Sequence, residues 1–229
     1  MNDISFDIRD GEIVALMGPN GCGKTTLLKI IAGFEMQSTG SILYNTHAIQ
    51  DLRCGIVFQN TQESLFPWQT VERHLTTKPA PLMPNEALEA LLKQLGLYEH
   101  RRKYPYQLSG GMAQLLAIGR AFAQAPQLFL LDEPFAALDY YTALNVQQRF
   151  LELWETQRTT TLVITHTLEE AIFLADRIIV FSEAPGRVVA NIPIKLERPR
   201  QREIMANPLF HAIKTAALNA LTGFLICVP

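Results

Sequence analysis

The sequence of 229 residues has little cysteine. Its three cysteines, Cys22, Cys54 and Cys227, form no CxxC pair and no ligand cluster with the five scattered histidines. An odd number of cysteines excludes a complete disulfide framework within one chain. This composition favours a reducing, cytosolic setting.

The sequence also lacks an excess of basic residues. Charged residues make up 18% of the chain, and the net charge is −2 with a sequence pI near 6.2. Proteins whose main partner is DNA or RNA usually show a basic excess. We therefore expect no nucleic-acid partner.

Long hydrophobic runs are missing as well. Residues 1–12 carry acids and no apolar core of a signal peptide. The uncharged run at residues 215–229 contains Asn219 and is shorter than the ~20 apolar residues that a membrane span needs. We therefore predict a soluble chain without signal peptide or span.

Hydrophobic residues are nevertheless plentiful, at 48% of the chain, which is enough for the core of one large α/β domain. Ile4, Phe6 and Ile8 alternate with polar residues, a pattern that predicts a short strand with Phe6 in the core. Longer apolar runs predict strands at residues 12–17, 55–59, 128–131, 161–165 and 177–182. The last three lack alternation, which is typical of parallel strands covered on both faces.

Helical periodicity marks the rest of the chain. Residues 24–32 read as a helix that ends at Gly33. After prolines at 79, 81 and 84, helices are predicted at residues 85–97 and 112–124. We predict an α/β fold with a mostly parallel sheet and an inserted helical subdomain. The predicted parts are a core of residues 1–59 and 126–185, a helical subdomain of residues 60–125, and a tail of residues 186–229 with a strand and a helix beginning near Pro208.

A glycine-rich motif follows the strand predicted at residues 12–17. Residues 18–25, GPNGCGKT, satisfy GxxxxGK[ST] and lead into a predicted helix, so a chance glycine-rich turn is a poor explanation. Backbone N–H groups and the helix N-terminus would surround phosphate, Lys24 would reach the β- and γ-phosphates, and Thr25 would bind Mg²⁺. The predicted ATP-binding residues of this phosphate loop are Gly18, Pro19, Asn20, Gly21, Cys22, Gly23, Lys24, Thr25 and Thr26.

Cys22 within the phosphate loop has two interpretations. A small residue is tolerated there, or its thiol is activated by the helix N-terminus and is sensitive to oxidation. Protection of the thiol by bound ATP would distinguish the two.

Polar residues follow three of the predicted strands. Asp132 would hold Mg²⁺ and Glu133 would act as general base toward water, a role that contributes about 10²–10⁴-fold to rate. His166 would contact the γ-phosphate, and the Gln59 amide would bind Mg²⁺ or the water. Isolated Asp-Glu pairs and single histidines are more often structural, but strand ends line the ligand crevice of such sheets.

Two further motifs narrow the class. Residues 108–112 read LSGGM and residues 137–139 read ALD. Together with the phosphate loop, Gln59, the LFLLDE run and His166, they resemble the ABC ATPase family, in the family order. The resemblance implies a P-loop NTPase of ABC type that uses ATP and Mg²⁺.

The resemblance also implies partners. Two ATPase domains of the family bind ATP between one phosphate loop and the other domain's signature turn, here Ser109, Gly110 and Gly111, with Asp139 nearby. A second ATPase subunit, most simply a copy of the chain, is therefore expected. The helical subdomain and the Gln59 region would bind a transmembrane permease, which places the chain on the cytoplasmic face of a bacterial membrane and links it indirectly to a substrate-binding protein.

Finer similarity points to importers of nitrate, sulfonate, taurine or thiamine-precursor-like solutes. It rests on Met112, the LFPWQTV run at residues 65–71 and the tail at residues 182–200. Within that run, Phe66 and Trp68 either pack inside the helical subdomain or face the permease.

The sequence departs from the family at its start. The family has an earlier strand and an aromatic residue that stacks on adenine, and Phe6 is a poor substitute. A misassigned start codon and a truncated gene both explain this. The alternatives to an importer ATPase are a non-hydrolysing or truncated subunit and a soluble ABC ATPase of DNA repair or translation, which usually has coiled-coil insertions or two ATPase domains.

Overall fold

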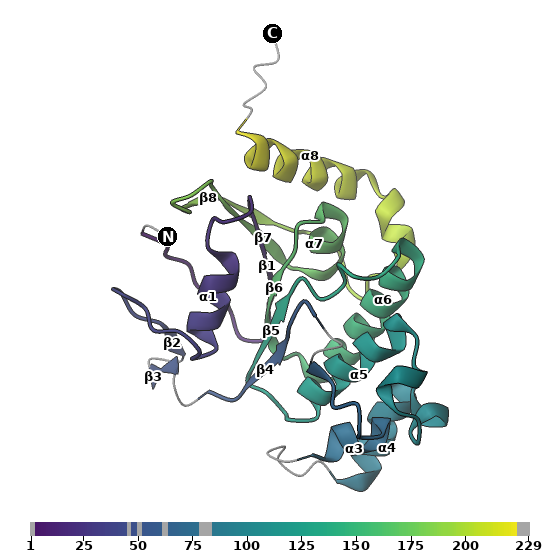
Figure 1. Cartoon of the computed structure of the whole chain (residues 1–229). Coiled ribbons are helices and arrows are strands. Elements are labelled where there is room, and N and C mark those ends of the chain that lie inside the picture. The colour runs from purple at the N-terminus through teal and green to yellow at the C-terminus, as the bar shows by residue number, and fades with distance from the viewer. Residues whose placement is uncertain (1–2, 45–46, 50–51, 61–63, 78–83, 224–229) are drawn as a thin grey trace. The chain divides into compact units, whose positions relative to one another are not determined.

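A computed structural model describes residues 3–44, 47–49, 52–60, 64–77 and 84–223 (Figure 1). Pro79, Pro81 and Cys227, named above, lie outside these residues. The chain forms two compact units. The first unit comprises Met1–Asp51 and Thr160–Pro229, and the second comprises Leu52–Thr159. The division into core, helical subdomain and tail stays a prediction.

The first unit is built on four strands. These are β1 (Ile13–Met17), β6 (Thr160–Ile164), β7 (Arg177–Phe181) and β8 (Val188–Pro193). β1 lies between β6 and β7 and is parallel to both, whereas β8 runs antiparallel to β7. Every residue of β1 and β6 is buried, including Thr160 and Thr161 of β6, as expected for strands covered on both faces. A short antiparallel hairpin, β2 (Leu43–Tyr44) and β3 (His47–Ala48), belongs to the same unit.

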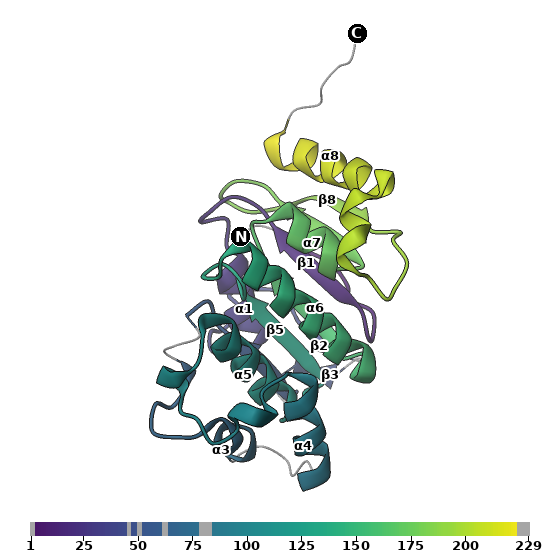
Figure 2. The same ribbon diagram turned by 90° about the vertical axis from the view of Figure 1, so that its right-hand side faces the viewer.

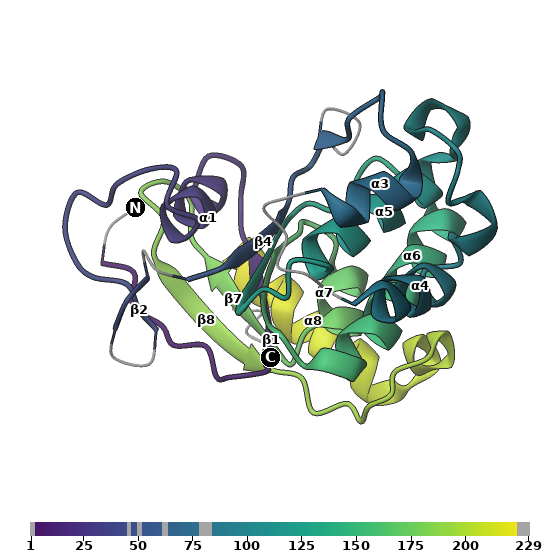
Figure 3. The same cartoon turned by 90° about the horizontal axis from the view of Figure 1, so that it is seen from below.

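Helices cover both faces of this sheet. α1 (Lys24–Ile31) lies on one face, while α7 (Leu168–Leu174) and α8 (Pro208–Thr222) lie on the other (Figures 1 and 3). α8 packs on α7, β7, β8 and the 3₁₀ turn η4 (Arg202–Ala206). It begins where the Asn207 side chain accepts a hydrogen bond from the Leu209 N–H (2.8 Å), with Pro208 at the first helical position.

The second unit pairs two parallel strands with a helical cluster. β4 (Cys54–Val57) pairs with β5 (Leu128–Asp132). α5 (Gly110–Phe122) packs against β4, α3 (Val71–Thr76) and α6 (Tyr140–Gln157), and Figure 2 shows α5 beside α3 and α6. The unit also contains α4 (Asn85–Gln94), η2 (Tyr98–His100) and η3 (Pro105–Gln107).

Buried aromatic rings form the core of the second unit. The Phe122 ring lies 4.7 Å from Phe129 and 6.3 Å from Phe150, and the Phe135 ring lies 6.5 Å from Phe150. All four side chains are buried. Burial of large aromatic surface of this kind contributes strongly to stability.

The predicted first strand is wrong. Residues 4–8, all within the described part of the chain, form no strand, and Phe6 is half-buried instead of lying in the core. Alternation specifies only which side chains share a face, whereas a strand also needs a neighbouring backbone to pair with. The Arg177 guanidinium holds this segment by contacting the Asp7 carbonyl oxygen and, at 3.7 Å, the Asp7 carboxylate.

The other predicted strands are confirmed within one to two residues, and so are the helices beginning near Lys24, Asn85, Gly110 and Pro208. α6, which had not been predicted, follows the ALD motif directly. No helix among the described residues is long and apolar enough to cross a membrane.

Candidate functional site

The phosphate loop connects β1 to α1 in the first unit. Gly18, Gly21 and Gly23 have φ values of 154°, 78° and 109°, in the region that favours glycine over other residues. These conformations turn the backbone tightly before α1 begins at Lys24, and the Leu27 N–H then bonds to the Gly23 carbonyl (2.8 Å). The loop therefore leads directly into a helix N-terminus, where backbone N–H groups attract anions.

Lys24 lies inside this loop. Its side chain is 7% exposed, and Nζ donates to the carbonyl oxygens of Gly18 (2.8 Å) and Pro19 (2.9 Å). A buried ammonium group needs such partners because its desolvation is costly. Thr25 and Thr26 are exposed on the first turn of α1. The Lys24 ammonium, the glycines with positive φ values and the exposed threonines lie together at the start of α1. This combination of groups suits a triphosphate.

Cys22 is 2% exposed, and its Sγ lies 3.6 Å from Lys24 Nζ. Burial agrees with the interpretation as a tolerated small residue. An external oxidant could reach the Cys22 thiol only after the loop opens. The proposal that this thiol is sensitive to oxidation therefore stays a hypothesis.

Gln59 and Glu133 meet in the second unit. Each residue lies just beyond one of the two parallel strands β4 and β5, and Gln59 Nε2 donates to Glu133 Oε2 at 3.1 Å. Glu133 has φ of 47°, an uncommon value for a residue with a side chain. Asp132, the last residue of β5, is buried beside it. The structure thus brings together two of the predicted catalytic groups and orients the carboxylate through an amide.

The LSGGM turn begins α5. Ser109 is its N-cap, and Oγ accepts a hydrogen bond from the Met112 N–H (3.3 Å). Gly111 faces α6 so closely that a Cβ there would lie 2.6 Å from Thr142 Cγ2. This contact fixes the start of α5 against the start of α6 and leaves Ser109 and Gly110 exposed at a helix N-terminus.

Asp139 caps α6 in the same way. Its Oδ1 accepts from the Thr142 N–H (3.1 Å), and α6 begins at the next residue. Hydrogen bonds from the Thr142 side chain and backbone hold the pKa of the Asp139 carboxyl below its ordinary value. The LSGGM turn and the ALD motif, distant in sequence, are therefore neighbours within the second unit.

His166 lies beyond the end of β6 and is exposed. β6 is parallel to β1, and Leu16 pairs with Ile164. The chain therefore leaves both strands at the same edge of the sheet, toward the phosphate loop after β1 and toward His166 after β6. This is the arrangement that the strand ends predicted.

Phe66 and Trp68 form a half-exposed aromatic pair. The ring centroids are 5.6 Å apart, and Trp68 is 71% exposed. His74 anchors Phe66: its ring stacks on the Phe66 ring at 5.9 Å, and its Nε2 accepts the Phe66 N–H (2.9 Å). The Arg120 guanidinium lies 5.5 Å from the Phe66 ring centroid. Phe66 contacts His74 and Arg120 within the second unit, although both Phe66 and Trp68 are exposed. A permease-facing role for the pair stays a prediction.

His74 is held in its neutral form. Burial lowers its pKa, the hydrogen bond to the Thr70 carbonyl opposes this, and Arg120 lowers it further. Nδ1 lies 2.8 Å from the Thr70 oxygen and must donate to it, while Nε2 accepts from Phe66. Sequence reasoning missed this residue, since nothing in its local pattern marks it.

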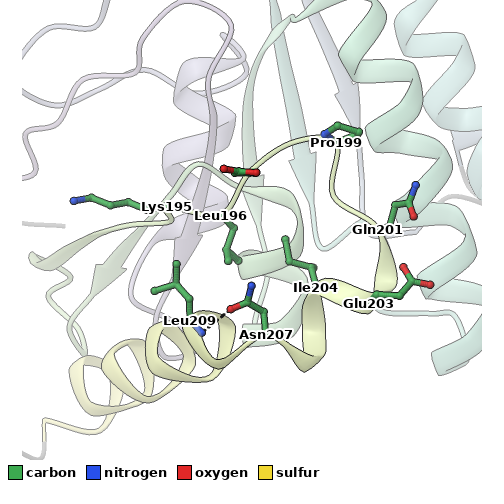
Figure 4. Close-up of a pocket in the computed structure, with 9 residues that line it drawn as sticks. Lys195, Leu196, Pro199, Gln201, Glu203, Ile204, Asn207 and Leu209 are labelled. Carbon is green, nitrogen blue, oxygen red and sulfur yellow. Dashed lines mark hydrogen bonds between the residues drawn. The ribbon is translucent and has the colours of Figure 1, made fainter.

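A pocket of about 520 Å³ lies on the C-terminal segment of the first unit (Figure 4). Leu196, Ile204 and Leu209 point toward one another inside it, and Lys195 points away. None of the predicted site residues lines it.

Among the described residues, no three His, Cys, Asp or Glu side chains gather as a metal site. The set predicted for Mg²⁺, Thr25, Gln59 and Asp132, does not depend on such a cluster. Mg²⁺ is commonly bound through one or two carboxylates together with substrate phosphates and water.

Known proteins resemble this chain in sequence. A family model described as ABC transporter matches residues 1–136. An uncharacterised ABC transporter ATP-binding protein of Methanocaldococcus jannaschii is 40% identical, over 88% of this chain and 78% of that protein. The aliphatic sulfonates import ATP-binding protein of Bacillus licheniformis is 36% identical, over 96% and 86%. The nitrate import ATP-binding protein of Synechococcus elongatus is 35% identical, over 96% and 84%.

Solved structures agree in fold. CbiO1 from Clostridium perfringens, part of an ABC transporter complex, superposes with a TM-score of 0.75 at 25% identity, covering 94% of this chain and 90% of that one. An ATP-binding cassette solved as a dimer bound to ADP and Pi has a TM-score of 0.69 at 29% identity, covering 85% and 90%.

Proposed function

Because the chain belongs to the ABC transporter family of ATP-hydrolysing subunits, we propose that it energises an importer of a small solute. Nitrate, sulfonates, taurine and thiamine-precursor-like molecules are the proposed substrate classes. Relatives that act in aliphatic sulfonate and nitrate import support this choice. The hydrogen bond between Gln59 and Glu133 is the observation that carries the catalytic part, since it places an oriented carboxylate at a strand end.

ATP binding is assigned to the phosphate loop. Backbone N–H groups of residues 20–26 and the Lys24 ammonium would bind the phosphates, with Lys24 exchanging its present carbonyl partners for phosphate oxygens. Thr25, Gln59 and Asp132 would hold Mg²⁺, which neutralises charge that develops on the phosphate oxygens.

Hydrolysis is assigned to Glu133. Its carboxylate would accept a proton as water attacks the γ-phosphorus, and the bond from that phosphorus to the ADP oxygen would break to release ADP and inorganic phosphate. Gln59 would hold the carboxylate in position, and His166 would donate a hydrogen bond to the γ-phosphate.

A second copy of the chain is the proposed ATPase partner. Ser109 and the N–H groups of Gly110 and Gly111 would contact the γ-phosphate held by the other copy, with Asp139 close to it. The exposed start of α5 supports this role, because backbone N–H groups at a helix N-terminus are suited to an anion. The dimeric state of a solved relative gives further support.

The permease is the proposed membrane partner. Trp68, exposed and in contact with the Phe66 ring, offers an aromatic anchor of the kind that dominates protein interfaces. The chain would then lie at the cytoplasmic face of the bacterial inner membrane and meet the substrate-binding protein only indirectly.

ATPase measurements on the purified chain test the chemistry. We expect Mg²⁺-dependent phosphate release that Glu133→Gln removes while ATP binding persists. Equal phosphate release by wild type and Glu133→Gln would contradict the assignment of Glu133.

Co-expression with a permease and a substrate-binding protein of the nitrate or sulfonate importer class tests the transport role. We expect ATP-dependent uptake of nitrate or an alkanesulfonate into membrane vesicles. Trp68→Ala should reduce co-purification of the permease, whereas Met36→Ala, which removes another exposed apolar side chain, should not. Full uptake activity with Trp68→Ala would remove Trp68 from the proposed interface.

A further inference from the structure

We propose that the turn between β7 and β8, residues 182–187, positions the phosphate loop, and that Gly186 is its key residue. This inference rests on the proposed role of the loop in ATP binding. All residues involved belong to the first unit. Gly186 is a positioning residue in this proposal, since it acts on the nucleotide only through the loop.

Gly186 packs directly against the backbone of the phosphate loop. A Cβ at this position would lie 2.2 Å from the Cys22 carbonyl oxygen, 3.2 Å from its carbonyl carbon and 3.4 Å from its Cβ. The φ of Gly186 lies outside the left-handed region, so its backbone conformation does not require glycine. The absence of a side chain serves close approach to Cys22, and glycine is the residue that permits it.

The same hairpin also touches the beginning of the loop. A Cβ on Gly18 would lie 2.8 Å from the Phe181 carbonyl oxygen and 2.9 Å from Phe181 Cβ. Phe181 is the last residue of β7, and its side chain is buried. The loop is therefore held at Gly18 by the end of β7 and at Cys22 by the turn that follows.

Hydrogen bonds fix the conformation of the turn that carries Gly186. The Ser182 N–H donates to the Arg187 carbonyl (2.9 Å), and the Arg187 N–H donates to Ser182 Oγ (3.1 Å). The Ser182 hydroxyl in turn donates to the Glu183 carbonyl (2.9 Å). One serine side chain thus closes the turn that carries Gly186.

Peptide planarity transmits the contact to the phosphate-binding groups. The Cys22 carbonyl and the Gly23 N–H belong to one planar peptide unit. Displacing the Cys22 oxygen therefore rotates the Gly23 N–H, one of the donors that would face a phosphate, and moves the residue that precedes Lys24. The turn sets the direction of that donor without touching the nucleotide.

Substitution of Gly186 by alanine tests the proposal. We expect the KM for ATP to rise roughly tenfold while kcat changes less than about threefold, because the change affects ground-state and transition-state binding alike. The melting temperature and dimer fraction are measured in parallel. A fall in kcat with an unchanged KM would overturn the proposal.

Cys22 supplies a second readout that a general loss of stability does not mimic. In a background with Cys54→Ser and Cys227→Ser, the buried thiol should react slowly with a thiol reagent, and Gly186→Ala should accelerate the reaction about tenfold at unchanged melting temperature. A KM and a labelling rate within twofold of wild type would overturn the proposal.

Variants of Ser182 test the same proposal if Gly186→Ala does not fold. Ser182→Ala should raise the KM about threefold, and Ser182→Thr, which retains the hydroxyl, should restore it. Glu183→Ala, an exposed position in the same turn, is the matched control. Equal KM values for Ser182→Ala and Glu183→Ala would overturn the proposal.

Lys24→Ala separates the inference from the proposed function. Retained ATP binding in Lys24→Ala would refute the role of the loop itself and, with it, this inference. Loss of binding in Lys24→Ala with a normal Gly186→Ala refutes the positioning role alone.

Discussion

The phosphate loop of the first unit and three predicted site residues of the second unit hold their polar groups differently. In the first unit the phosphate loop encloses its cation: Lys24 is buried and bonded to backbone carbonyls, and the β7–β8 hairpin packs against the loop at Gly18 and Cys22. In the second unit the side chains of Gln59, Ser109 and Asp139 stand exposed at strand ends and helix starts. The lysine of the phosphate loop is therefore held by buried backbone contacts, whereas these three side chains of the second unit are presented to solvent.

The comparison implies that substitutions in the second unit affect turnover more than binding. Glu133→Gln should lower kcat by about 10²–10⁴-fold, because the amide does not accept the proton of the attacking water. ATP affinity should stay within about threefold of wild type. Steady-state ATPase rates and calorimetric ATP binding measure the two effects, with Glu152→Gln on α6 as a control. A large loss of affinity in Glu133→Gln would break the comparison.

Substitution in the first unit should do the reverse. Lys24→Ala should weaken ATP binding by about 10- to 100-fold, since a charge-assisted hydrogen bond contributes about 1.5–3 kcal/mol. Lys29→Ala, half-exposed on the same helix, should bind ATP normally. Calorimetric titration of both variants decides the point, and equal affinities would contradict the assignment of Lys24.

The contact between α5 and α6 allows a sharper test within the second unit. Gly111→Ala places a Cβ 2.6 Å from Thr142 Cγ2 and should destabilise the chain by about 1–3 kcal/mol through overpacking. Thr142→Ser removes that methyl group and keeps the hydroxyl, so the double variant should recover most of the loss. Thermal unfolding of the four proteins forms a double-mutant cycle, and additive effects would show that the two residues do not interact.

The smallest expected effect is the pH dependence of His74. Burial lowers its pKa in the folded chain, so the unfolded chain binds the proton more readily. The stability that His74 contributes is fully present above its unfolded pKa and is lost as pH falls from that value toward the lower folded pKa. Protonation of Nε2 also removes the acceptor for the Phe66 N–H.

Melting curves between pH 7.5 and pH 5 measure this effect. We expect the melting temperature of wild type to fall more steeply over this range than that of His74→Gln, which has no titrating group. Parallel slopes for the two proteins would show that His74 stays uncoupled from folding.

Local features were read correctly from the sequence because their causes are local. The uninterrupted apolar run of β5 predicted a buried strand, and the glycine-rich motif before Lys24 predicted the loop. The strand expected around Phe6 failed for the opposite reason, since its alternation was real but pairing depends on a distant backbone. The sequence predicted that Gln59 and Glu133 follow strands that end at one edge of the sheet. It did not predict the hydrogen bond between their side chains.

By itself the sequence determined the family, the ATPase chemistry and the positions of the phosphate loop, because motif spacing and apolar runs act over a few residues. Only the tertiary structure decided that Gly186 presses on Cys22, that Gly111 abuts Thr142 and that His74 supports Phe66. The Gly186 and Gly111 contacts join residues far apart in the chain. They depend on how closely two distant segments pack, to within a few tenths of an ångström. No local sequence pattern encodes that separation.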